Sequence, residues 1–284
     1  MGMKKEARVL IIEADTYARS WMALLLARDW RTSIVGEIST LEEAPAFFST
    51  VQAKKRGTPN LILLDVEPVA HALPGLLPEL SRLPGAPSVL LIGETVEPRL
   101  VEAAVEAISA RASGAAAFPG FLGYLLKHEI RHSLAWAIAL AEAESWVITP
   151  ALAPFFRRLR GRSAQRSILV LKGDRRIPGL TNHDVEMARL ALIFSMERGD
   201  MSDEIKVSKE WVYGLVSALY KKMGMEELVN GETDPSTFLN AHLAQMPQVR
   251  EVLREAATGK NKKGKDLETL AYHILTEPDV EPLD

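Results

Sequence analysis

The residues Leu180–Met225, LTNHDVEMARLALIFSMERGDMSDEIKVSKEWVYGLVSALYKKMGM, carry the clearest structural pattern in the chain. Apolar side chains recur there at intervals of three and four residues, which is the spacing of one face of a helix. The pattern predicts three short helices around one small core. Ser208 is placed to cap a helix over Lys209–Met223, and Gly224 is placed to end it. The apolar positions are Met187, Leu190, Ala191, Phe194, Met201, Ile205, Val207, Val212, Leu215, Val216 and Leu219.

The second part of this stretch resembles the helix-turn-helix of LuxR/NarL-type transcription regulators. The family has an I-A pair, an I-S pair and a closing I-x-x-K-L-G run, and the chain places Met201–Ser202, Val207–Ser208 and Leu219–Gly224 at these positions. Trp211 and Leu215 stand where the family has threonine and histidine. The resemblance implies a second helix that lies in the major groove of duplex DNA.

The resemblance also implies which side chains contact DNA. Lys209, Tyr213, Ser217 and Lys221 are predicted to face the groove, and Lys206 and Lys222 are predicted to contact phosphates. Gly214 lies inside the presumed recognition helix, where glycine weakens a helix by roughly 1 kcal/mol relative to alanine. Four acidic residues lie close by, namely Asp200, Asp203, Glu204 and Glu210. A helical domain that no longer binds nucleic acid therefore stays open as an alternative.

The composition is that of an ordinary globular protein. With 284 residues, 47% of them apolar and 25% charged, the chain is long enough for two domains with separate cores. Its net charge of −3 gives no overall attraction to nucleic acid, so a DNA site must be a local patch. The lack of cysteine excludes disulfides, thiolate zinc sites and cysteine nucleophiles, and it is compatible with a cytoplasmic protein. No apolar run approaches the length of a membrane span, so no membrane partner is expected.

The first half of the chain alternates between short apolar runs and stretches of helical period. The runs are continuous in apolar residues, as in parallel strands that are buried on both faces. Such alternation predicts an α/β domain with a doubly wound, five-stranded parallel sheet. The predicted strands are Arg8–Glu13, Thr32–Gly36, Asn60–Asp65, Ser88–Ile92 and Gly114–Phe118, and the predicted helices are Thr16–Arg28, Leu41–Lys55, Glu97–Ala112 and Phe121–Ser145.

Residues 8–145 resemble the receiver domain of response regulators. Such receivers carry an acidic pair after the first strand, a phosphorylated aspartate after the third, a threonine or serine after the fourth and a lysine after the fifth. Asp65 matches the phosphoacceptor and Glu13 matches the first acid, so these two carboxylates are the candidate ligands of Mg²⁺. The second acid falls on Ala14, the hydroxyl on Gly93 and the lysine near Gly120–Phe121.

These departures bear on the chemistry of the site. Phosphoryl transfer to a carboxylate needs Mg²⁺ and a cation that neutralises the developing charge. Because the second acid, the hydroxyl and the lysine are missing from the pattern, we expect a pseudo-receiver that is not switched by ordinary aspartate phosphorylation and that requires no cofactor. Such a domain serves as a scaffold for dimerisation or for a partner.

The run His128–His132, HEIRH, matches two further patterns. It fits H-E-x-x-H, in which two histidines on one helical face bind zinc and the glutamate acts as general base, but Ile138 stands at the metzincin third-ligand position. It also resembles the H-box of sensor histidine kinases, which would make His128 a phosphoacceptor. No glycine-rich nucleotide motif accompanies it. Both enzyme interpretations are alternatives to a helix that closes the receiver-like domain.

Four parts are predicted along the chain: a receiver-like domain at 1–145, a connector at 146–178, the helix-turn-helix domain at 179–226 and a helical extension at 227–284. The connector contains a strand-like run at Ser167–Leu171. It also contains a basic cluster that could contact DNA phosphates or an acidic partner, formed by Arg157, Arg158, Arg160 and Arg162. In the extension, helices are expected at 234–245, 248–258 and 267–275.

The sequence thus predicts an atypical response regulator that binds double-stranded DNA and forms a homodimer. Its receiver-like domain is expected to respond to a protein partner or a small ligand. The alternative is a signalling adaptor in which both modules have become protein-interaction surfaces. Enzymatic activity is not expected.

Overall fold

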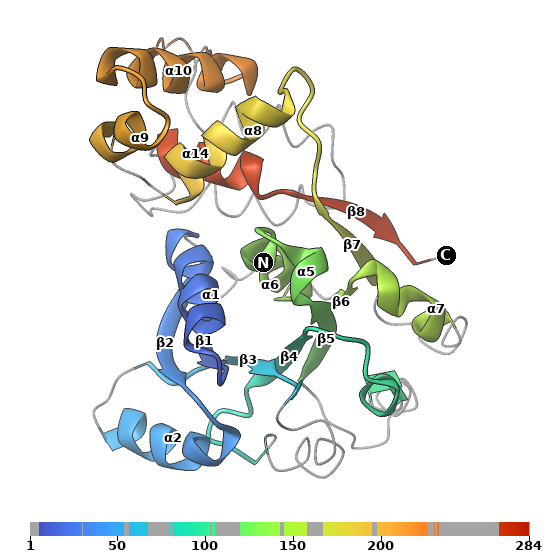
Figure 1. The fold of residues 1–284 in the computed structure, drawn as a ribbon. Coiled ribbons are helices and arrows are strands. Elements are labelled where there is room, and N and C mark those ends of the chain that lie inside the picture. The colour runs from blue at the N-terminus through green and yellow to red at the C-terminus, as the bar shows by residue number, and fades with distance from the viewer. Residues whose placement is uncertain are drawn as a thin grey trace. The chain divides into compact units, whose positions relative to one another are not determined.

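A computed structural model gives the structure of the protein (Figure 1). It describes residues 6–29, 31–53, 57–67, 80, 82–102, 104–105, 120–142, 145–157, 167–194, 198–226, 230, 232 and 267–283. The described chain belongs to two compact units. An α/β unit takes in residues from the ranges 5–27, 31–173 and 278–284, and a helical unit takes in Arg28, Asp29 and residues from 174–277.

The α/β unit is built on one eight-stranded sheet in the order β2-β1-β3-β4-β5-β6-β7-β8. Neighbouring strands from β2 to β7 are parallel. β8 runs opposite to β7, because Leu283 donates to the carbonyl of Ile168 while Glu281 pairs with Lys172. The strands are β1 (Ala7–Ile12), β2 (Thr32–Ile38), β3 (Leu61–Asp65), β4 (Ser88–Gly93), β5 (Phe121–Leu126), β6 (Trp146–Ile148), β7 (Ile168–Asp174) and β8 (Pro278–Pro282).

The prediction of a five-stranded sheet was wrong, although the four strands expected first are confirmed as β1 to β4. The fifth strand was expected at Gly114–Phe118, which lies outside the described residues. The strand that follows β4 in the sheet is β5, and it occupies the start of the stretch expected to be a helix at Phe121–Ser145. Its six residues are all buried. An apolar run this short has the same signature in a buried strand and in a buried helix, which explains the error.

Gly123 lets the sheet continue beyond β5. Its φ is 154°, and a β carbon at this position would lie only 1.9 Å from the carbonyl oxygen of Val147 on β6. Only glycine allows two strands to approach in this way. Beyond β6, the strand-like run expected at Ser167–Leu171 is confirmed as β7, and β8 forms where a helical extension was expected.

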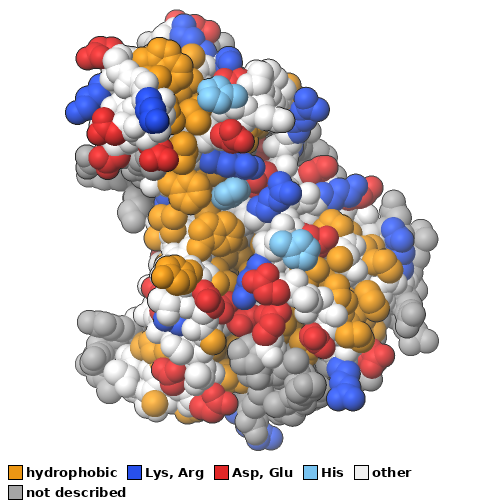
Figure 2. All heavy atoms as spheres, in the orientation of Figure 1, with side chains coloured by type: hydrophobic (Ala, Val, Ile, Leu, Met, Phe, Trp, Pro, Cys, Tyr) orange, Lys and Arg blue, Asp and Glu red, His pale blue; other side chains and the backbone are white. Residues whose placement is uncertain are grey.

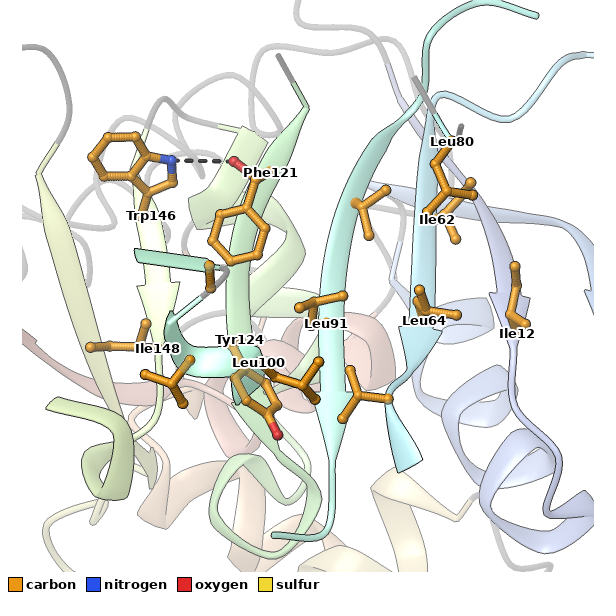
Figure 3. Close-up of a cluster of buried hydrophobic side chains, with 14 of the residues drawn as sticks. Ile12, Ile62, Leu64, Leu80, Leu91, Leu100, Phe121, Tyr124, Trp146 and Ile148 are labelled. Carbon is orange, nitrogen blue, oxygen red and sulfur yellow. Dashed lines mark hydrogen bonds between the residues drawn. The ribbon is translucent and has the colours of Figure 1, made fainter. Parts of the chain in front are cut away.

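Helices cover both faces of the sheet. Alternate residues of the strands form one core cluster with Ala44 and Phe48 of α2 (Ala44–Ala53), as Figure 3 shows for part of it. Within this cluster the indole nitrogen of Trp146 donates to the carbonyl of Phe121 at 3.2 Å. The residues that alternate with the cluster residues along β1 and β3, such as Val9, are also buried. α6 (Leu134–Glu142) contacts β1, β5 and β6 without joining that cluster, so the sheet is covered on two sides.

The helical unit contains α8 (Asn182–Ala188), a π-helical turn at Arg189–Ile193, α9 (Arg198–Glu204), α10 (Lys209–Lys222) and α14 (Leu267–Leu275). The predicted cap is confirmed, because the hydroxyl of Ser208 accepts from the backbone N–H of Trp211. Gly224 follows α10 with a φ of 78°, as expected for a residue that ends a helix. The helix expected at 267–275 is confirmed as α14, whereas those expected at 234–245 and 248–258 lie outside the described residues.

The helical unit also includes the end of α1 (Thr16–Arg28). Arg28 donates to the carbonyl of Ile193 at 2.9 Å, and its guanidinium lies 5.5 Å from the ring centre of Tyr272. The next residue, Asp29, lies 3.4 Å from the ring nitrogen of His273, and both side chains are buried. A short piece of the early chain is therefore part of the core of this unit. No helix among the described residues is long and apolar enough to cross a membrane.

Candidate functional site

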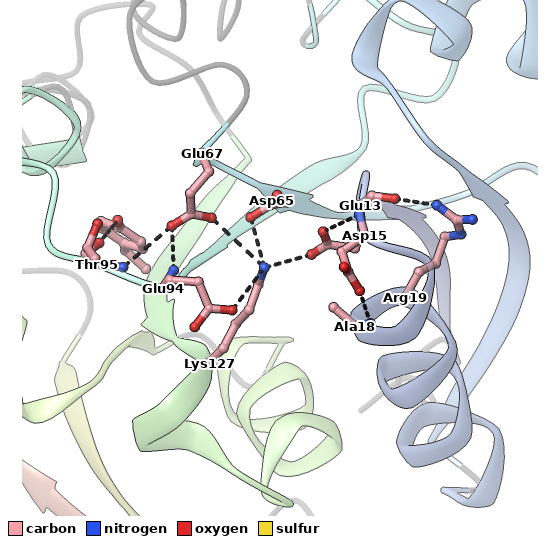
Figure 4. A network of polar contacts seen from close by, with 10 residues as sticks. Glu13, Asp15, Ala18, Arg19, Asp65, Glu67, Glu94, Thr95 and Lys127 are labelled. Carbon is pink, nitrogen blue, oxygen red and sulfur yellow. Dashed lines mark hydrogen bonds and ion pairs between the residues drawn. The ribbon is translucent and has the colours of Figure 1, made fainter.

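A single lysine lies at the centre of a cluster of four acidic side chains in the α/β unit (Figure 4). The ammonium of Lys127 is 2.8 Å from Glu13, 3.2 Å from Asp65, 3.4 Å from Glu94 and 3.9 Å from Glu67. Glu13 and Asp65 are buried, while Glu67 and Glu94 lie closer to the surface. Acidic side chains also gather on the visible surface of this unit in Figure 2.

The parallel sheet brings these side chains together. Glu13 directly follows β1, Asp65 ends β3, Glu94 directly follows β4 and Lys127 directly follows β5. These four strands are neighbours in the sheet, and their carboxyl ends lie along one edge. Ligands of open parallel α/β sheets bind outside this edge. Glu13 and Asp65, the two acids singled out in the sequence, both lie beside Lys127.

The sequence analysis missed Lys127. It placed the lysine that receivers carry after the fifth strand near Gly120–Phe121, where the chain has none. The position was counted from a strand expected too early in the chain. Once β5 is known to end at Leu126, Lys127 is the first residue after it and reaches both buried acids. The apolar run Phe121–Leu126 followed by a lysine was the signal that could have identified it.

Asp15 does not contribute its carboxylate to this cluster. Its side chain accepts from the backbone N–H of Ala18 at 2.7 Å and so caps the start of α1, while its own N–H donates to Glu13 at 2.9 Å. Ala14 is exposed. Of the acidic pair that receivers carry after the first strand, only one carboxylate is therefore present in the cluster, that of Glu13.

Gly93 explains the missing hydroxyl after β4. A β carbon there would lie 2.6 Å from a methyl group of Val66, 2.9 Å from Glu67 Oε1 and 3.2 Å from the hydroxyl of Tyr124. Contacts below 3.0 Å between a side chain and such atoms require something to move. The space that a threonine or serine would need is therefore occupied by other groups.

The surroundings of Asp65 hold a proton on this group. Burial, a hydrogen bond with Glu67 and the charge of Glu13 raise the pKa of Asp65 to about 8, against the opposing charge of Lys127. Burial would also raise the pKa of Glu67, but hydrogen bonds from Asp65 and from the backbone N–H of Glu94 lower it overall. At neutral pH Asp65 is protonated and Glu67 is ionised. A protonated carboxyl group is a weak nucleophile.

Lys127 keeps its charge in this setting. Desolvation would lower the pKa of Lys127, but the hydrogen bond to Glu13 and the charge of Asp65 raise it overall. Its ammonium therefore remains the cation of the cluster. No group of three histidine or acidic side chains among the described residues is arranged to hold a metal ion, so the cluster does not fit Mg²⁺.

The H-E-x-x-H pattern does not form a zinc site. α5 (Lys127–Ile130) ends at Arg131, whose φ is 47°, so His128 and His132 do not lie on one helical face. The ring of His132 instead lies 5.9 Å from that of Trp21. The single helix expected at Phe121–Ser145 is replaced by β5, α5 and α6, and the break between α5 and α6 falls inside the pattern.

The surface of α10 is the second candidate site. All six residues expected to contact DNA are exposed: Lys206, Lys209, Tyr213, Ser217, Lys221 and Lys222. The same helix buries Val212, Val216 and Leu219 on its other side. In the view of Figure 2, basic side chains of the helical unit are scattered among acidic and apolar ones.

Two of these lysines are held in ion pairs. Lys221 lies 2.7 Å from Glu226, and both side chains are about half exposed. Lys222 lies 2.7 Å from Asp184, and this pair, with hydrogen bonds from Thr181, lowers the pKa of Asp184 to about 2. Of the basic cluster expected in the connector, Arg157 is exposed, and Arg158, Arg160 and Arg162 lie outside the described residues.

No protein-family model matches the chain, and no curated protein matches its sequence. Solved structures with some likeness are response regulators. ChrA of a haem-sensing two-component system is 18% identical, with 78% of this chain and 91% of that chain covered and a TM-score of 0.36. RcsB from Salmonella typhimurium is 12% identical, with 78% and 94% covered and a TM-score of 0.41. RcsB from Salmonella enterica serovar Typhimurium, bound to the promoter P1flhDC in the presence of phosphomimetic BeF3-, is 13% identical, with 89% and 100% covered and a TM-score of 0.38. Because these TM-scores are low, the likeness assigns no function to the chain.

Proposed function

We propose that the protein is a DNA-binding transcription regulator of the response-regulator type. The observation that carries the proposal is the placement of α10. Its apolar side is buried through Val212, Val216 and Leu219, while Lys209 and Tyr213 lie on exposed positions. A second helix placed in this way on a helix-turn-helix is the element that enters the major groove.

The segment between α9 and α10 supports this assignment. Val207 donates to the carbonyl of Ser202 at 3.0 Å, and Lys206 adopts a φ of 56°, so the chain turns sharply there. Ser208 then caps α10. A turn fixed by hydrogen bonds holds the two helices at a set angle, which a groove-binding helix needs.

The domain bounds expected from the sequence change with the sheet, because β6, β7 and β8 belong to the α/β unit and not to a connector or an extension. In our proposal the α/β unit receives a protein partner or a small ligand, and the helical unit, with residues 179–226, binds DNA. The protein acts as a homodimer, without enzymatic activity and without a required cofactor. A protonated Asp65 at neutral pH favours control by something other than its phosphorylation.

Fluorescence anisotropy of a labelled DNA duplex tests the proposal over a series of salt concentrations. The full chain should bind at low salt and lose affinity as salt rises. Lys209→Ala with Lys221→Ala should weaken binding and lower the slope of log affinity against log salt by about two, if each lysine contacts one phosphate. Tyr213→Ala should weaken binding with the slope unchanged.

A matched control removes two charges elsewhere. Arg82 and Arg99 are exposed on the α/β unit, so Arg82→Ala with Arg99→Ala changes the net charge equally. This control should bind DNA like the unaltered protein. Equal weakening in both double variants, or no retention of DNA by the full chain at low salt, would refute the proposal.

A signalling adaptor is the second candidate, and the exposed aromatic residues of α10 favour it. Trp211 is 46% exposed and Tyr213 is 62% exposed. Tryptophan and tyrosine are common at the centres of protein interfaces. Acidic residues such as Glu210 also lie exposed beside them. This candidate predicts no DNA binding at low salt, together with a protein complex that Trp211→Ala weakens.

A further inference from the structure

Glu67 makes contacts that neither sequence pattern predicts. One oxygen of its carboxylate accepts from the backbone N–H of Glu94 in a short hydrogen bond and from that of Thr95 at 3.4 Å. The other oxygen lies 3.9 Å from the ammonium of Lys127. Two backbone N–H groups and a lysine together form a small site for negative charge, and a side chain of the same unit fills it (Figure 4).

The segment that donates these hydrogen bonds is also held from a second side. The hydroxyl of Tyr124 on β5 donates to the carbonyl of Thr95 at 2.8 Å. Glu67 and Tyr124 therefore fix the residues after β4 through opposite backbone groups. The segment has little freedom to move while both contacts are present.

Gly93 leaves room for the seated carboxylate of Glu67. A β carbon at residue 93 would lie 2.9 Å from Glu67 Oε1 and 2.6 Å from a methyl group of Val66, so a side chain there would require these groups to move. The chain has glycine at this position, where receivers carry a hydroxyl residue. The absence of a side chain at residue 93 and the presence of a carboxylate at residue 67 thus fit each other.

We infer that Glu67 is an internal ligand that occupies the anion site beside Asp65, in the place that a small external oxyanion would otherwise take. The seated carboxylate satisfies the backbone donors after β4 and the ammonium of Lys127. It keeps the edge of the sheet in one arrangement without modification of Asp65. The inference deepens the proposed function, because it rests on a regulatory α/β unit that works without phosphorylation.

Amide hydrogen exchange of the full chain tests this directly, with inorganic phosphate as the probe of an open anion site. In the unaltered protein, the N–H groups of Glu94 and Thr95 should be protected, and the probe should change nothing. In Glu67→Ala they should exchange at least about tenfold faster, because they lose their acceptor. Added inorganic phosphate should then restore their protection.

Two further variants sharpen the result. Glu67→Gln keeps a side-chain oxygen of nearly the same size, so protection should stay within about threefold of the unaltered protein. Glu37, an exposed carboxylate on β2, gives the matched control Glu37→Ala, which should leave both amides unchanged.

Several outcomes would overturn the inference. These are a folded Glu67→Ala that keeps full protection, a folded Glu67→Ala that does not respond to inorganic phosphate, and an unaltered protein that does respond. If Glu67→Ala does not fold, amide exchange in the unaltered protein still tests the inference. Rapid exchange of the Glu94 and Thr95 amides there would show that Glu67 does not hold them. The experiment contains no DNA, so its failure is distinguishable from failure of DNA binding by α10.

Discussion

Lys222 Nζ lies 2.7 Å from one carboxylate oxygen of Asp184 and 2.8 Å from the other. Asp184 also forms the capping box of α8 with Thr181. The last turn of α10 is therefore tied to the first turn of α8. The sequence assigned Lys222 to a DNA phosphate, and the structure gives it a partner within the helical unit.

Lys222→Ala should lower the free energy of unfolding by about 1 kcal/mol, an amount reduced because Lys222 is partly exposed to solvent. The pKa of Asp184 is lowered in the folded state to about 2, so the stabilisation is present above pH 4 and is lost as pH falls through about 2. Urea unfolding at pH 7 and at pH 2.5 measures the difference. Lys221→Ala removes a more exposed pair and should cost less than about 0.5 kcal/mol. Equal losses in both variants would contradict this.

Lys127→Met should destabilise the α/β unit by about 3 kcal/mol, because it leaves the buried carboxylate of Glu13 without its cation. Thermal unfolding followed by circular dichroism measures the loss. Lys172 pairs with Glu281 near the surface, so Lys172→Met should have a much smaller effect. A Lys127→Met protein as stable as the Lys172 control would show that the cluster is solvated.

Asp65→Asn should stabilise the protein, and more so at high pH. The pKa of Asp65 is raised to about 8 when folded, while an unfolded aspartate titrates near 4. Between these values the folded protein retains a proton that the unfolded chain has released, so its stability falls as pH rises. Because Glu67 shares the proton, the gain is smaller than the full shift would give at about 1.4 kcal/mol per pKa unit, and we expect Asp65→Asn to gain about 2 kcal/mol more at pH 8 than at pH 5. Denaturant unfolding at both pH values, with Glu37→Gln as control, checks this. A gain independent of pH would count against it.

Gly123→Ala should cost more than about 3 kcal/mol, or prevent folding, because the added carbon would lie 1.9 Å from the carbonyl of Val147. Gly214 offers the matched control, because a β carbon there meets no atom within 4 Å. Gly214→Ala should stabilise α10 by up to about 1 kcal/mol. Thermal unfolding of the two variants should therefore shift in opposite directions, and a shared direction would disprove the assignment of β5 and β6.

The sequence predicted the parts of the fold that depend on local pattern. β1 and β3 are apolar runs, followed by Glu13 in the first case and ended by Asp65 in the second, and both acids lie beside Lys127. The cap at Ser208 follows from its position before a helical period.

The remaining features depend on contacts between distant residues. Lys127 became a site residue only because β5 ends before it, and nothing local distinguishes that apolar run from a helix. The role of Glu67 depends on backbone N–H groups of another strand end, which leave no trace in the residue types.

The position of β8 constrains the order of folding during synthesis. This strand completes the edge of the sheet next to β7, yet the whole segment from α8 to α14 is translated between them. Domains usually fold in the order in which they leave the ribosome. Until β8 is synthesised, β7 is an uncovered edge strand of the nascent sheet. Such an edge can pair with strands of other chains. The period before residues 278–282 emerge is therefore when this protein is most exposed to aggregation and to capture by chaperones.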